Sequence, residues 1–194
     1  LLSSHINKSI KGIVEQVEQI AEGVRLGQLD RRGNPEEAVI DFRNIITGLN
    51  EMINVFIAPI NLTAEYVDRI SKGDPPPKIT EVYHGDFNEI KNNLNQLIDV
   101  IQNLLKETGD IIVAVKAGKL DKRANDTQFE NRWKQMVQGV NDIVDAFVAP
   151  INVTAEYVDR ISKGDLPPKI AEVYHGDFNE IKNNLNQLID SVDN

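Results

Sequence analysis

The residues of this chain best suited to chemistry are two histidines, two pairs of aspartates and one tryptophan. His84 and His175 each lie two positions before an aspartate, Asp86 or Asp177. An imidazole near a carboxylate is a combination that serves metal binding and proton transfer. No other histidine lies nearby in the sequence, so a metal site would lack further ligands. We interpret both histidines as loop or solvent-exposed side chains.

The other candidates have structural explanations. The aspartate pairs Asp30/Asp121 and Asp74/Asp165 follow glycines, where turn formation explains them better than catalysis. Trp133 occupies a position that holds phenylalanine elsewhere in the chain, so we expect it in a hydrophobic core. The sequence contains no nucleophile–base pair, glycine-rich phosphate loop or kinase-like motif. We therefore expect no enzyme activity, no metal and no cofactor.

Composition narrows the function classes further. The chain has 194 residues, of which 41% are apolar and 6% aromatic, which favours aliphatic helical packing. The absence of cysteine excludes disulfides and cysteine-based zinc sites. A net charge of −9 argues against nucleic-acid binding. No uninterrupted run of 18 apolar residues is present, so we expect no membrane-spanning segment within these residues.

The chain contains an internal repeat with an offset of 91 residues. Residues 59–99 align with residues 150–190 without a gap, and 38 of these 41 positions are identical. A shorter period lies inside the repeat, because glycines in a similar context recur at steps of 46, 45 and 46 residues. These glycines are Gly27, Gly73, Gly118 and Gly164. The spacing predicts four modules in A-B-A′-B′ order, at residues 1–57, 58–102, 103–148 and 149–194.

The second module shows the pattern within one unit. Apolar or small residues recur at steps of three and four over residues 60–70, which predicts a helix with one apolar face. Pro59 and its counterpart Pro150 are expected near the first turn of this helix, and a left-handed glycine is expected to end it. Three consecutive prolines then predict an extended connector. The residues expected to anchor the connector onto the helices are Ile79, Val82 and, in the fourth module, Ile170.

The second helix of each module has a predicted start and a heptad pattern. Asp86 is a favourable N-cap, and Glu89 three residues later completes a capping box. Apolar residues then repeat at steps of three and four, which predicts one packing face. The corresponding acidic positions are Asp41, Asp177 and Glu180. The heptad positions are Phe42, Ile45, Leu49, Met52 and Phe56; Phe87, Ile90, Leu94, Leu97 and Ile101; Trp133, Met136, Val140, Ile143 and Phe147; and Phe178, Ile181, Leu185 and Leu188.

Connector length predicts the topology of a module. The stretch from Gly73 to Gly85 has 13 residues, whereas antiparallel helices need a loop of roughly 2–8 residues. An extended connector of this length can run back along the first helix, so we expect the two helices to be parallel. Two parallel amphipathic helices cannot bury both apolar faces alone. A homodimer would supply two more helices and complete a parallel four-helix bundle.

The heptad phase changes at each predicted junction between modules. At all three junctions the apolar pattern continues after a step of four, from Phe56 to Ile60, from Ile101 to Leu105 and from Phe147 to Ile151. Such a step is a stutter, which shifts the packing phase without ending the helix. The middle junction contains no proline, so a continuous helix is expected from Asp86 to about Lys116.

This helix–connector–helix pattern resembles the HAMP domain, a signal-relay module of bacterial and archaeal membrane receptors. The matching features are the glycine after the first helix, the spaced apolar residues of the connector and the acidic start of the second helix. The resemblance covers nearly the whole chain. The Asp-Glu-x-Gly signature of the family is met in part, because Gly85 and Gly176 stand where the first aspartate is usual and Arg132 departs from it.

The resemblance implies a tandem HAMP array: an all-α homodimer whose four parallel bundles stack end to end. It implies signal relay between the sensor and output domains of a methyl-accepting chemotaxis receptor, on the cytoplasmic side of the inner membrane. The implied partners are a second copy and the flanking domains; membrane contact would come only through a helix outside these residues. Two alternatives stay open: a ligand-binding helical sensor with antiparallel helices, and a passive spacer in a sensor histidine kinase.

Overall fold

The chain folds into helices joined by extended connectors. The computed structural model describes residues 2–193, and no β-strand occurs within that range. The helices are α1 (Leu2–Arg25), α2 (Arg43–Ser71), α3 (Gly85–Lys116), α4 (Asn131–Ser162) and α5 (Gly176–Val192). Two 3-10 helices, η1 (Pro35–Glu37) and η2 (Ile40–Phe42), precede α2. The predicted all-α fold class is confirmed.

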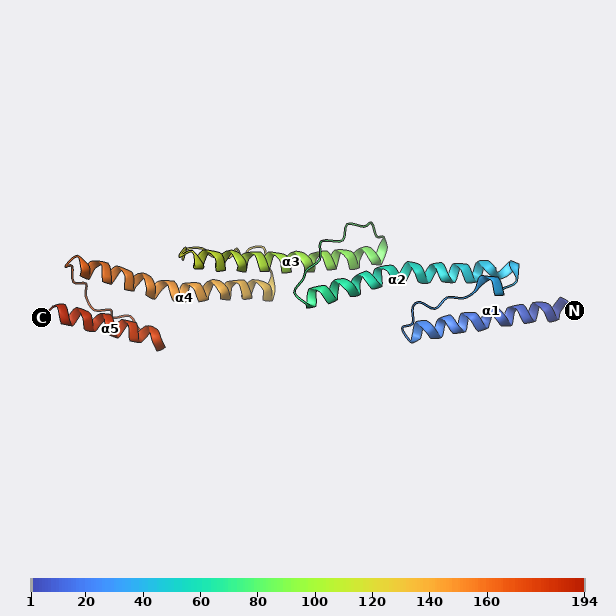
Figure 1. Cartoon of the computed structure of the whole chain (residues 1–194), viewed down its shortest axis with the longest axis horizontal. Coiled ribbons are helices and arrows are strands. Elements are labelled where there is room, and N and C mark those ends of the chain that lie inside the picture. The colour runs from blue at the N-terminus through green and yellow to red at the C-terminus, as the bar shows by residue number, and fades with distance from the viewer. Residues whose placement is uncertain (1, 194) are drawn as a thin grey trace. The chain divides into compact units, whose positions relative to one another are not determined.

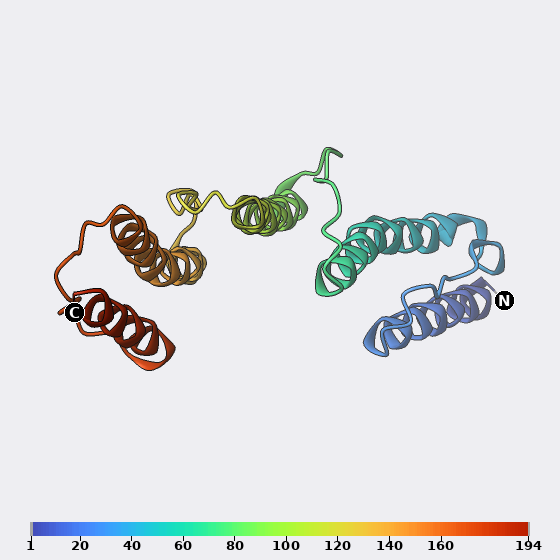
Figure 2. The same cartoon turned by 60° about the vertical axis from the view of Figure 1, so that its left-hand side comes forward.

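The chain divides into two units, Leu1–Asp99 and Val100–Asn194. In the first unit, α1 and α2 run in the same direction, because the connector between them returns along α1 (Figure 1). In the second unit, α4 and α5 are likewise parallel and joined by a returning connector (Figure 2). Parallel helices with long connectors are the topology expected from connector length. They do not fit a ligand-binding bundle of antiparallel helices.

Three helices continue through the predicted junctions between modules. The continuous helix predicted across the middle junction is present as α3. The expectation that Pro59 and Pro150 begin new helices is wrong, because both lie buried inside α2 and α4. A proline removes one backbone hydrogen bond and costs about 3 kcal/mol in a helix interior. Residues on both sides of Pro59 pack against α3, since Phe56 contacts Phe87 and Tyr66 lies in a cluster with Leu94.

The core of a module lies between its two helices and beneath its connector. In the second module the buried cluster consists of Tyr66, Ile79, Leu94 and Ile98, with Tyr83 packed at its edge. In the third module it consists of Ile111, Ala124, Phe129 and Val137. In both clusters one or two residues come from the connector, so the connector supplies part of the hydrophobic core.

The connector anchors differ in part from the prediction. Ile79 and Ile170 are 4% and 6% exposed, so both are core residues. Val82 was expected to be an anchor, but it is 79% exposed. The chain bends at Glu81, which turns Val82 away and lets Tyr83 pack against the core instead. The fully buried Pro76 is a further anchor.

The expected capping box does not form. Helix α3 begins at Gly85 and α5 at Gly176, one residue before the aspartates that were expected to cap them. These glycines have φ of 55° and 54°, a left-handed conformation that glycine adopts without strain. Asp86 and Asp177 therefore lie inside the first turn, where a carboxylate interacts favourably with the helix dipole. Asp41 lies in η2, and Glu89 and Glu180 are exposed.

One segment of the described chain, Ile40–Ser71, is long and apolar enough to cross a membrane by length and composition, with a mean hydropathy of 1.3. The expectation of no such segment was based on uninterrupted apolar runs, and asparagines and acidic residues interrupt this one. Its apolar residues lie mostly outside the core of this chain. We attribute them to a packing face of α2.

Candidate functional site

The residues considered first for chemistry are dispersed on the surface. His84 and His175 are exposed, as are Asp30 and Asp121. Within the described residues, no group of three or more histidine, aspartate or glutamate side chains is placed to hold a metal ion. The structure brings together a different set of polar residues, which hold each connector against the second helix of its module.

An asparagine in each second helix makes the same two hydrogen bonds to its connector. In the second module the backbone N–H of Ile79 donates to Asn95 Oδ1 at 2.7 Å, and Asn95 Nδ2 donates to the Ile79 carbonyl at 3.0 Å. One amide side chain thus satisfies both backbone groups of one buried connector residue. The same pair of bonds joins Asn50 to Gly33, Asn141 to Ala124 and Asn186 to Ile170. We call Asn50, Asn95, Asn141 and Asn186 the connector asparagines.

Replacing Asn95 by alanine is expected to destabilise the second module by about 2–3 kcal/mol. The change leaves the N–H and C=O of a buried residue without partners, and each unpaired buried group costs about 1–3 kcal/mol. The matched control is Asn93→Ala, because Asn93 lies in the same helix but is exposed. Equal denaturant midpoints for the two variants would show that the connector asparagines do not hold the connector.

A basic residue forms a second contact between connector and helix in every module. It lies five residues after the glycine that ends the first helix, which we call the capping glycine. Its partner lies four residues after the connector asparagine. Lys78 Nζ is 2.6 Å from Asp99 Oδ2, and Lys169 Nζ is 2.7 Å from Asp190 Oδ1. The other two pairs use arginine: Arg123 Nε donates to Asp145 at 3.0 Å and Arg32 Nε donates to Asn54 at 3.0 Å.

In the first and third modules, a side chain of the first helix accepts a hydrogen bond from the connector backbone, and the second and fourth modules have no such bond at this position. Asn34 N–H donates to Gln16 Oε1 at 2.8 Å, and Asn125 N–H donates to Glu107 Oε2 at 2.8 Å. Glu107 is buried. The corresponding positions of the second and fourth modules are Leu62 and Val153, which cannot accept a hydrogen bond. The two halves of the 91-residue repeat therefore differ in how the connector is held.

The capping glycines end the first helices as their positions in the repeat require. Gly27, Gly73, Gly118 and Gly164 have φ between 72° and 77°. Beside two of them an arginine–aspartate pair spans the cap, with Arg69 Nε donating to Asp74 at 2.9 Å and Arg160 Nε donating to Asp165 at 2.7 Å. The hydrogen bond from Arg160 lowers the pKa of the Asp165 carboxyl below its usual value. These pairs explain the aspartates that follow Gly73 and Gly164.

The second helices have two apolar faces, of which only one is buried. The face beneath the connector carries the most buried residues, among them Ile46, Ile98 and Val137. The adjacent face, one residue earlier in the sequence, carries most of the heptad residues, and many of these are exposed. Their exposed fractions are 49% at Ile45, 50% at Met52, 45% at Met136 and 41% at Ile181 and Leu188. Leu94 and Leu185 are exceptions, because they are heptad residues that are buried in the core at 8% and 7% exposed. We call this exposed face, together with the matching face of each first helix, the seam.

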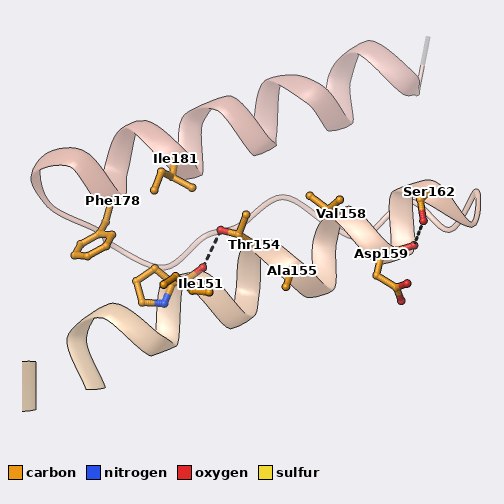
Figure 3. A pocket seen from close by; sticks show the side chains of 9 residues that line it. Ile151, Thr154, Ala155, Val158, Asp159, Ser162, Phe178 and Ile181 are labelled. Atoms are coloured by element: carbon orange, nitrogen blue, oxygen red, sulfur yellow. Dashed lines mark hydrogen bonds between the residues drawn. The ribbon is translucent and has the colours of Figure 1, made fainter. Parts of the chain in front are cut away.

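Grooves along the seam occur in the second and fourth modules. The groove of the fourth module has a volume of about 790 Å³, and Figure 3 shows Phe178 and Ile181 of α5 facing Ile151 and Thr154 of α4 across it. The hydroxyl of Thr154 donates to the Pro150 carbonyl at 2.8 Å. Thr63 makes the same bond to Pro59 at 2.7 Å. Each hydroxyl is thus satisfied within its own helix, and the groove is mainly apolar.

Two junctions carry an aromatic contact. The rings of Phe56 and Phe87 meet edge to face with centroids 5.6 Å apart, and Phe147 and Phe178 do the same at 5.6 Å. Trp133, the counterpart of Phe87 in the third module, was expected in the core but is 41% exposed. It lies on the seam, and Phe129 is the buried aromatic residue of that module instead. Of the remaining junction residues, Ile60, Leu105 and Ile151 are also exposed on the seam, and Ile101 is half-buried.

A family comparison identifies this architecture. A model of the HAMP domain matches residues 40–103 and 128–194. The chain belongs to the HAMP domain family. HAMP domains are signalling linkers of receptors and sensor kinases, in which they work within dimers between other domains and carry no catalytic site. The resemblance read from the sequence is therefore confirmed, and two matched segments fit a tandem HAMP array.

The structure also explains where the chain departs from the HAMP signature. Gly85 and Gly176 replace an aspartate at a position with positive φ, and Asn131, at the same position of the third module, has φ of 49°. Glycine and asparagine are the residues that best tolerate this conformation. The connector asparagines and the basic residues that face the helix were missed as site residues. The basic residues recur five positions after each capping glycine, and the asparagines recur 22 or 23 positions after it, so this fourfold recurrence was the available signal.

Proposed function

We propose that this HAMP chain is the relay segment of a transmembrane receptor of the methyl-accepting chemotaxis type. In this proposal it forms a parallel homodimer of four modules, at residues 1–57, 58–102, 103–148 and 149–194, on the cytoplasmic side of the inner membrane. The chain passes a conformational bias from sensor to output through its own packing. It supplies no catalysis and binds no cofactor, nucleic acid or small ligand.

The exposed seam is the observation that carries the proposal. Each helix pair buries one apolar face beneath its connector and leaves the other open, with Ile60, Val67 and Ile90 between 41% and 51% exposed in the second module. A second copy placed in parallel would cover this face with the same face of its own helices, because a twofold interface is self-complementary. The result is a four-helix bundle in each module.

The continuous helices support relay over passive spacing. Helices α2, α3 and α4 each belong to two modules, so rotation of a helix in one module rotates it in the next. Each junction carries a stutter, which changes the packing phase between neighbours. Neighbouring modules can therefore hold opposite packing states, and a signal changes sign at each module. Such a relay needs two states separated by only a few kcal/mol.

The repeat allows a test that counts modules. Deleting residues 60–150 removes 91 residues and joins Pro59 to Ile151, which restores the native junction sequence. Deleting residues 60–104 removes one module of 45 residues and joins Pro59 to Leu105, the counterpart of Ile60. If each module inverts the signal, the first deletion keeps the sign of the output and the second reverses it. The readout is the stimulus response of a receptor that contains this chain.

A passive spacer predicts a different result. Both deletions shorten the array by whole modules and keep its local contacts, so a spacer would transmit a response of normal sign in both. That outcome would overturn the relay proposal. Crosslinking of single cysteines on the seam of the fourth module would verify that both shortened chains still form dimers.

A further inference from the structure

The second and fourth modules present the same groove. In the second module it is lined by Pro59, Ile60, Thr63, Ala64, Val67, Phe87 and Ile90. In the fourth it is lined by the residues 91 positions later, each of the same type: Pro150, Ile151, Thr154, Ala155, Val158, Phe178 and Ile181. Their volumes are about 390 and 790 Å³, and the larger one extends further, to Asp159 and Ser162. Asp68 and Ser71 hold those two positions in the second module, so the side chains that a partner would meet are the same.

The first and third modules differ on the seam only by exchanges among uncharged residues. In their second helices the pairs are Phe42/Trp133, Ile45/Met136, Leu49/Val140, Met52/Ile143 and Phe56/Phe147. In their first helices the pairs are Val14/Leu105, Val17/Thr108, Ala21/Ile112 and Val24/Val115. Coiled coils fix their register with a buried polar residue or with complementary charges. No charged residue occupies these positions, so the seam carries no charge that rejects a shifted partner.

We propose that a second copy of this chain docks on the seam in two registers, one aligned and one shifted by 91 residues. This inference rests on the proposed parallel homodimer. In the shifted register the second module of one copy packs on the fourth module of the other, and the first packs on the third. The identical grooves accept either partner equally. Only the uncharged exchanges in the first and third modules distinguish the two registers.

The two registers differ in how the assembly closes. The aligned pair is twofold symmetric and covers every seam, so it is complete with two chains. The shifted pair leaves two modules of each chain uncovered, and these bind further copies in the same way. A head-to-tail contact of this kind grows into longer assemblies. The shifted form therefore increases with protein concentration, and flanking domains that join the two chains at one end of a receptor select the aligned form.

Single cysteines report the register directly, because the native chain contains no cysteine. Ile60→Cys and Ile151→Cys are prepared on chains that carry tags of different size, then mixed, refolded together and treated with a short bismaleimide. Aligned pairs give products that join two like chains. Shifted pairs give a mixed product, in which position 60 of one chain is joined to position 151 of the other. We expect a mixed product whose yield, relative to the like-chain products, rises with concentration, because a shifted pair covers half of each seam and gains the rest only by binding further copies.

As a second test, a double variant that introduces charges should favour the shifted register over the aligned one. The pair Thr63→Asp with Thr154→Lys places like charges in the aligned grooves and opposite charges in the shifted one. It should raise the mixed product at least about tenfold, because like charges at an interface are strongly disfavoured. The matched control, Thr63→Asp with Thr154→Asp, repels in both registers and should not raise it.

The outcomes separate this inference from the proposed dimer. Like-chain products alone, in the native background and in the steering variant, would overturn the two-register inference and leave the aligned dimer standing. Absence of both products would overturn the parallel dimer, and the inference with it. An antiparallel pair would give neither product, because residues 60 and 151 would face other positions.

Discussion

Replacing Ile79 by aspartate is expected to unfold the second module locally, with a loss of about 3 kcal/mol or more. Ile79 is 4% exposed and packs with Tyr66, Leu94 and Ile98. An aspartate there would place a carboxylate among apolar side chains with no cation to pair with it, which ranks among the most destabilising single changes. The connector asparagine Asn95 would lose its two bonds as the connector leaves the core. Native-state hydrogen exchange of the amides in α3 measures the effect.

The matched control for this prediction is Val82→Asp. Val82 lies three residues later in the same connector and is 79% exposed, so the same charge should change stability by no more than about 0.5 kcal/mol. If both variants retained native protection, the connector would not be part of the core. If both lost it, added charge rather than burial would be the cause.

The spacing of the connector residues predicts the burial of Ile79 but not the exposure of Val82. An extended polyproline-type segment has three residues per turn, so Pro76, Ile79 and Val82 should share one face. The first two are buried as this spacing requires. The bend at Glu81 then rotates Val82 outward. Nothing in the residue types near Glu81 indicates this bend, because its cause is the path that the chain must take to reach α3.

The helices were predicted more completely than their surroundings. The heptad pattern located the seam, and the absence of a breaker predicted that α3 is continuous. The pattern did not show that Ile46, Ile98 and Val137 form a second, more buried face one residue later. Local periodicity reports that a residue is apolar, but it does not report whether the connector or another chain covers it.

The polar contacts of the connector were the least predictable part. Asn95 and its partner Ile79 lie 16 residues apart in the sequence. A side-chain amide that satisfies a distant backbone depends on how two segments dock, and spacing along one helix carries no such information. The capping box failed for a related reason, because Gly85 adopts a left-handed conformation and begins the helix one residue early.

Placing aspartate on the seam of two modules, by Ile60→Asp with Ile151→Asp, is expected to abolish stable association. Both isoleucines line the grooves and are about half exposed in the single chain, so the substitutions leave its own core intact. In the dimer each carboxylate would be buried beside its symmetry mate. The change occurs four times per dimer, and burial of an unpaired charge costs several kcal/mol. Sedimentation velocity should show a shift from dimer to monomer.

The control places the same charge beside the groove instead of inside it. Asn61→Asp with Asn152→Asp adds two carboxylates per chain in the same helical turns, at exposed positions that do not line either groove. This variant should sediment as the native chain does. Dissociation of both variants would point to net charge, which is already −9, as the cause. Persistence of both dimers would place the interface elsewhere on the chain.

The molecular mass of the unmodified chain in solution tests the central claim most directly. The seam exists in this account because a second copy covers it, so sedimentation equilibrium at micromolar concentration should give a minimum mass of twice 21.8 kDa. The circular dichroism spectrum of the same sample should be strongly helical. A helical species that stays at 21.8 kDa as its concentration is raised would show that the seam is stable in water, and would contradict the dimeric relay.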